Sequence, residues 1–192
     1  MNARLGRPTL ALALLILGVG AGRSEAGEPA LPAPPDLIPM SIRTVRMDEA
    51  LHSPVVILET AKRDRALPIV IGHGEAFAIL RQLHSAEPPP RPMTHDLLKS
   101  VITALGGKVE RVVITRLEKG TFHAAIVVRQ GEKVTAIDSR ASDGMALALR
   151  TGAALFVARA VLDEAGVAPG EVPDDEQPEP PPRPPGPGKQ AI

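Results

Sequence analysis

The sequence contains no cysteine, no tryptophan and no tyrosine, and it has only three phenylalanines among 192 residues. The absence of cysteine excludes disulfide bonds, thiol nucleophiles, zinc–thiolate centres and the lipid-bearing cysteine of a bacterial lipoprotein. Because aromatic residues are scarce, a core must be built from aliphatic side chains. The same scarcity leaves few rings on which nucleic-acid bases could stack. The chain also lacks an excess of either charge, with 22 Lys and Arg against 22 Asp and Glu.

Charge and proline are distributed unevenly along the chain. Residues 40–166 hold 17 Lys and Arg against 14 Asp and Glu, whereas residues 167–192 hold 2 against 5. The resulting charge of 17 − 14 = +3 permits contact with phosphate, but it is far below the dense basic stripe of a tight nucleic-acid binder. Prolines concentrate at both ends of this body. They predict a Pro-rich linker over residues 22–40 and a disordered, acidic Pro-rich tail over residues 167–192.

The first 21 residues have the pattern of an export signal. Arg4 and Arg7 precede an apolar run over residues 10–19, and Val19-Gly20-Ala21 offers the small residues that a signal peptidase accepts. The apolar run is too short for a comfortable permanent membrane span. The sequence therefore predicts a signal peptide over residues 1–21 and an exported protein, periplasmic or extracellular, without a membrane span after cleavage.

Between these ends, residues 41–166 predict a single compact α+β domain with a mostly antiparallel sheet and three to four helices. Short apolar or β-branched runs predict strands at 41–47, 55–58, 67–71, 109–117, 121–129, 133–137 and 155–157. Helical spacing of apolar residues predicts helices at 72–83, 94–105 and 142–150, with a last helical turn through residue 162. The short turns around residues 119–120 and 131 predict an antiparallel meander of three strands.

Four ordered sequence blocks within this body carry a family resemblance. They are LPIVIG at 67–72, PRPMTHDLL at 90–98, GTF at 120–122 and DSRASD at 138–143. With Glu75 after the first block, this pattern resembles the bifunctional nuclease family, which includes plant proteins that act on both DNA and RNA and many bacterial proteins. Ala141 departs from the family pattern, which usually has proline there. Gly144-Met145 stands where the family usually has Ala-Ile, and Gly144 is expected to loosen the helix by up to about 1 kcal/mol relative to alanine.

The resemblance implies a nuclease that acts on DNA or RNA with the help of Mg²⁺ or Mn²⁺. A nuclease needs a metal ion or a general base to activate water, and cationic groups to stabilise charge that develops on phosphate. His95, Asp138 and Asp143 are the candidate catalytic residues. The candidate metal ligands are Glu75, Asp96, Asp138 and Asp143, and the candidate substrate-binding residues are Arg91, Arg140, Ser139 and Ser142.

Each of these residues also has a structural interpretation. Ser142 or Asp143 at a helix start could serve as a cap, and Asp138 could pair with Arg140. Asp96 suits the dipole in a first helical turn. These alternatives leave open a second function, a non-catalytic binding or oligomerisation module whose polar turn binds an anion. We expect a homo-oligomer.

Overall fold

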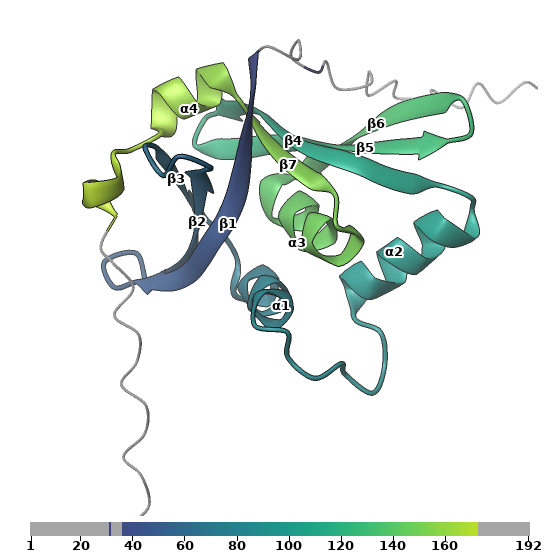
Figure 1. Ribbon diagram of the computed structural model, residues 1–192. Coiled ribbons are helices and arrows are strands. Elements are labelled where there is room, and N and C mark those ends of the chain that lie inside the picture. The colour runs from purple at the N-terminus through teal and green to yellow at the C-terminus, as the bar shows by residue number, and fades with distance from the viewer. Residues whose placement is uncertain (1–30, 32–35, 173–192) are drawn as a thin grey trace, which may run out of the picture.

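The computed structural model describes residue 31 and residues 36–172 (Figure 1). The predicted signal peptide, most of the predicted linker and most of the predicted tail lie outside these residues. The described part is an α+β domain in which a seven-stranded, mostly antiparallel sheet packs with four α-helices. No helix within residues 36–172 is long and apolar enough to cross a membrane.

The elements follow the predicted order closely. The strands are β1 (Leu37–Asp48), β2 (Ser53–Thr60), β3 (Ala66–Val70), β4 (Lys108–Glu118), β5 (Thr121–Gln130), β6 (Lys133–Arg140) and β7 (Ala154–Ala158). The α-helices are α1 (His73–Leu83), α2 (Thr94–Ala104), α3 (Ala141–Thr151) and α4 (Arg159–Ala165), followed by a 3-10 turn at Pro169–Glu171. The predicted meander β4-β5-β6 is confirmed, because both of its pairings are antiparallel.

The sheet order is β3-β2-β1-β7-β4-β5-β6, so the short strand β7 joins two antiparallel halves. It pairs with β1 in the antiparallel sense and with β4 in the parallel sense. Helices α1, α2 and α3 lie together on one side of the sheet, and α4 lies at the opposite end of the molecule from α1 (Figure 1). This arrangement brings the first turns of three helices into one region.

The first strand begins earlier than the sequence indicated, at Leu37 rather than near residue 41. Pro39 is paired with Phe156 of β7, and on its other side the pairing with β2 begins only at Met40, so an N–H directed to that side would have no partner in the ladder. Met40 is buried in the core. At the other end, Val172 is buried against Val55 and Ile57. The folded part therefore extends a few residues beyond 41–166 at both ends.

The core is aliphatic, as the composition predicts. Its largest fully buried side chains are Ile57, Leu58, Leu67, Ile79, Ile114, Met145, Leu147, Val56, Val112, Val113, Val127 and Val157. Most of α3 is buried, because one of its faces packs on β4 and β5 and others contact α1 and α2. The residues at the start of α3 are consequently held in place by neighbours on several sides.

Gly144 is required by this packing, contrary to the expectation that it only loosens the helix. A Cβ atom at position 144 would lie 2.7 Å from Cγ1 of Val112, which is fully buried and cannot move aside freely. We predict that Gly144→Ala lowers the free energy of unfolding by about 1–3 kcal/mol. Gly74→Ala in α1 is the matched control, because a Cβ there meets no atom within 4 Å. The control should be neutral or stabilising by up to about 1 kcal/mol. Urea unfolding of both variants measures the difference; equal stability would contradict the packing argument.

Candidate active site

A cleft of about 390 Å³ opens where the first turns of α1, α2 and α3 meet. Glu75 of α1, His95 of α2 and Asp143 of α3 each project into it from the first turn of their helix. The amino ends of helices carry unpaired N–H groups and a positive partial charge, which favour carboxylates and bound anions. The same location therefore explains the acidic residues and suits a phosphate group.

Arg140 joins α3 to α1 across this cleft. Its Nε and Nη2 atoms donate to the two carboxylate oxygens of Asp143 at 2.7 and 3.0 Å, and Nη2 also lies 2.6 Å from Oε1 of Glu75. The hydrogen bonds and charge of Asp143, together with those of Glu75, raise the pKa of the Arg140 guanidinium above its usual range. The side chain is nevertheless 65% exposed, and these contacts do not use its Nη1 donors. Arg140 is thus oriented by protein and still accessible to a ligand.

From α2, His95 joins Glu75, Arg140 and Asp143 in one cluster on the cleft. Its Nε2 atom lies 3.3 Å from Oδ1 of Asp143, and its side chain is only 11% exposed. Burial raises the pKa of Asp143, but the hydrogen bonds and charges of Arg140 and His95 outweigh it and leave that pKa below the ordinary value. Asp143 is therefore ionised at neutral pH and can accept a hydrogen bond from the Nε2–H group of His95. In that tautomer Nδ1 is the basic nitrogen of the ring.

Asp96, the neighbour of His95, belongs to a second network that the sequence analysis missed. Its Oδ1 accepts from Nε of Arg150 at 2.6 Å, and its Oδ2 accepts from the backbone N–H of Met93 at 3.0 Å. Arg150 is buried and also donates through Nη1 to the carbonyl oxygens of Ala78 and Ala146. Burial raises the pKa of Asp96, yet the Met93 N–H and Arg150 lower it below its ordinary value. Arg150 thereby connects α1, α2 and α3.

The remaining predicted site residues lie outside the cluster. In the β5–β6 register Ser139 is opposite Ala124, on the face that packs against Gly144 of α3, whereas Asp138 is opposite Ala125 and so faces the other side of the sheet. Ser142 is buried in α3, and neither serine lines the cleft. Arg91 is exposed in the segment before α2 and does not line the cleft either. The structure thus brings together Glu75, His95, Arg140 and Asp143 only.

These four residues do not form a ready site for a divalent cation. Within residues 36–172, no group of three or more His, Cys, Asp or Glu side chains is placed to hold a metal ion. The guanidinium of Arg140 lies between the carboxylates of Glu75 and Asp143, where a bridging cation would have to sit. The carboxylates of Asp96 and Asp138 point to other partners or the other sheet face. The arrangement of Glu75, Asp96, Asp138 and Asp143 therefore does not fit the predicted Mg²⁺ or Mn²⁺ site.

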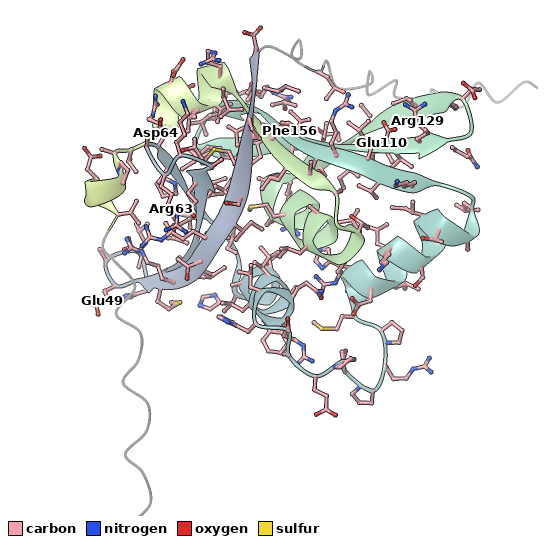
Figure 2. All side chains as sticks on the ribbon, in the orientation of Figure 1. Glu49, Arg63, Asp64, Glu110, Arg129 and Phe156 are labelled. Atoms are coloured by element: carbon pink, nitrogen blue, oxygen red, sulfur yellow. The ribbon has the colours of Figure 1, made fainter. Side chains whose placement is uncertain are left out.

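Two further charged groups of the domain do not line this cleft. Glu110 and Arg129 pair across β4 and β5 at 2.5 Å, and Arg63 and Asp64 belong to the turn between β2 and β3. Figure 2 shows these two groups on opposite sides of the molecule. They are solvent-exposed ion pairs or turn residues of the usual kind, and none of them lines the cleft. In the cluster around Asp143, by contrast, a partly buried histidine, two carboxylates and an arginine share a cleft.

Comparison with known proteins agrees with the resemblance in the sequence. Residues 56–169 match the bifunctional nuclease domain, and this match includes all four residues of the cluster. Two proteins of Mycobacterium tuberculosis, "Uncharacterized protein MT1877" from strain CDC 1551 / Oshkosh and "Uncharacterized protein Rv1829" from strain ATCC 25618 / H37Rv, are each 42% identical over 135 residues. Each alignment covers 70% of this chain and 78% of the relative. From the matched domain and the sequence identity we conclude that this chain belongs to the bifunctional nuclease domain family.

Proposed function

We propose that this protein is an exported nuclease that hydrolyses phosphodiester bonds of DNA or RNA. The observation that carries this proposal is the chain of contacts His95–Asp143–Arg140–Glu75 on a cleft formed by three helix starts, in a domain of the bifunctional nuclease family. Export is supported by the sequence of residues 1–21 alone.

The residues of the cleft divide the steps of hydrolysis among them. Asp143 orients His95, and the Nδ1 atom of His95 takes a proton from water or from a ribose hydroxyl as that oxygen bonds to phosphorus. The P–O bond to the leaving sugar oxygen breaks at the same time, and that oxygen takes up a proton from solvent. The Nη1 donors of Arg140 bind the non-bridging phosphate oxygens, on which negative charge grows in the transition state. Glu75 keeps the guanidinium in position.

Electrostatics within the cleft constrain this mechanism. With His95 neutral, the four side chains sum to a charge of −1, which by itself repels phosphate. The positive ends of α1, α2 and α3 oppose that charge, and protonation of His95 on proton transfer brings the side-chain sum to zero. The transition state, in which His95 is charged, should therefore be bound more favourably than the substrate.

A divalent cation would supply Lewis-acid stabilisation of the phosphate, but the donor set described above does not form a site for it. The proposal assigns no step to a metal ion.

The test is an assay of the purified chain on single-stranded DNA, duplex DNA and RNA, with Mg²⁺, Mn²⁺ or a chelator. Cleavage that persists in the chelator supports the mechanism above. Cleavage that needs a metal ion would keep the nuclease and refute its metal-free mechanism, and no cleavage would refute the nuclease.

A second candidate function, a non-catalytic module that assembles with further copies of itself, is favoured by the outer face of α2. Leu97, Val101 and Leu105 recur at helical spacing there and are 57%, 45% and 68% exposed. An apolar stripe without charges is self-complementary across a two-fold axis, so a second copy of this chain is the occupant that we propose.

We predict that Val101→Glu dissociates this oligomer, because it buries a charge at the centre of an apolar contact. Thr103→Glu is the matched control, since Thr103 is exposed on the same helix but outside the stripe. Sedimentation equilibrium should show an oligomer for the wild type and for the control, and a monomer for Val101→Glu. A monomeric wild-type protein at micromolar concentration would contradict the interface.

A further inference from the structure

One wall of the cleft is apolar and carries an exposed aromatic ring. Phe77 of α1 lines the cleft together with Ala78 and Met93, while Arg140 and Asp143 line its polar wall. Phe77 is 55% exposed, whereas the other two phenylalanines, Phe122 and Phe156, are half-buried. Of the three phenylalanines, Phe77 is thus the one largely exposed to water, and it lies in the candidate active site.

The ring is also held in place. The guanidinium carbon of Arg81, one helical turn further along α1, lies 5.6 Å from the centroid of Phe77, within the range of a cation–π contact. Arg81 itself donates a hydrogen bond through Nη2 to the backbone carbonyl of Glu87. A ring that is fixed before binding loses little freedom when a ligand stacks on it. One face of the ring carries the guanidinium, and the side chain still keeps more than half of its surface exposed.

We propose that Phe77 is the base-stacking residue of a nucleotide subsite, in which Arg140 binds the phosphate and Phe77 the adjoining unpaired base. This inference rests on the proposed function and adds a substrate class to it, namely single-stranded nucleic acid. Arg140 on the polar wall and Phe77 on the apolar wall match the phosphate and the base of a nucleotide. A base inside a duplex is already stacked on its neighbours, so only an unpaired base can reach the ring.

The absence of tryptophan and tyrosine makes a direct test available. In the full chain carrying Phe77→Trp, the emission of the single tryptophan reports on position 77 alone. We expect AMP to quench this emission and ribose 5-phosphate, which lacks the base, to leave it unchanged. Leu51→Trp is the matched control, because Leu51 is 58% exposed in the turn after β1, outside the cleft. Equal quenching at both positions, or none at position 77, would overturn the subsite.

A second variant separates binding from catalysis. Phe77→Leu should weaken binding of a single-stranded, cleavage-resistant phosphorothioate thymidine octamer about tenfold, with little change for the same octamer in a duplex. Unchanged affinity for the single strand would overturn the inference even if the protein cleaves nucleic acid. Conversely, base-dependent binding without any cleavage would support the subsite and refute the nuclease. Because Phe77 is largely exposed, its replacement should not unfold α1.

Discussion

Replacing Asp143 with asparagine should lower the rate of phosphodiester cleavage at least about hundredfold while the domain stays folded. Asparagine keeps the size of the side chain but removes the charge that holds both His95 and Arg140. His95 then loses the charged partner that fixes its tautomer, and Glu75 becomes the one carboxylate in contact with Arg140 within this cluster. His95→Gln should cause a loss of similar size, because the proposed base is removed directly. Steady-state cleavage of labelled single-stranded DNA and RNA measures both effects.

Asp138→Asn is the informative comparison for this experiment. Asp138 lies only five residues from Asp143 in the same polar motif, but its side chain faces the other side of the sheet. We expect cleavage by Asp138→Asn to stay within about twofold of the wild type. If Asp138→Asn abolished cleavage and Asp143→Asn did not, the site would be the one suggested by the sequence motif, and the cluster in the cleft would be structural. Circular dichroism of each variant confirms that the fold is retained.

The contrast between these two aspartates shows how far sequence patterns reach. Periodicity and turn residues predicted the strands and helices because those signals are local, and the meander followed from its short connections. The position of β7 between β1 and β4 was not predictable from them, since a five-residue strand carries no information about its neighbours. Side chains alternate along β6, so Asp138 and Ser139 face opposite sides, and the packing of the sheet on α3 decides that Ser139 is the one facing the helix.

The site was predicted in part for the same reason. Glu75, His95, Arg140 and Asp143 were all candidates, but nothing in their spacing showed that an arginine would occupy the position between the two carboxylates. The same sequence pattern fits two arrangements. Carboxylates that face each other attract a metal ion, whereas carboxylates already paired with an arginine do not. Asp96 was a candidate metal ligand as a carboxylate in the block at 90–98 that carries the family resemblance. Its true partner, Arg150, resembles an ordinary cation in the last turn of a helix, where such residues are common.

Replacing Arg150 with methionine should lower the free energy of unfolding by about 3 kcal/mol. The methionine fills much of the volume but leaves the carboxylate of Asp96 without its cation and two carbonyl oxygens without their donor. Unpaired buried polar groups each carry a desolvation penalty, and Arg150 is one of the few charged residues whose side chain is almost fully buried. Urea or thermal unfolding measures the loss, which should appear as a fall in the melting temperature of several degrees or more.

Arg159→Met is the control for this measurement, because Arg159 is exposed at the start of α4 and should contribute little to the free energy of unfolding.

The position of Arg150 has a further consequence for catalysis. By bonding to α1, α2 and α3 at once, it sets where His95 stands relative to Asp143, so its loss should reduce cleavage even at temperatures where the variant is folded. Arg150→Met with unchanged stability would show that the helices are positioned by apolar packing alone. Lost stability with full cleavage activity would show that the ion pair supports the fold but does not align the cleft.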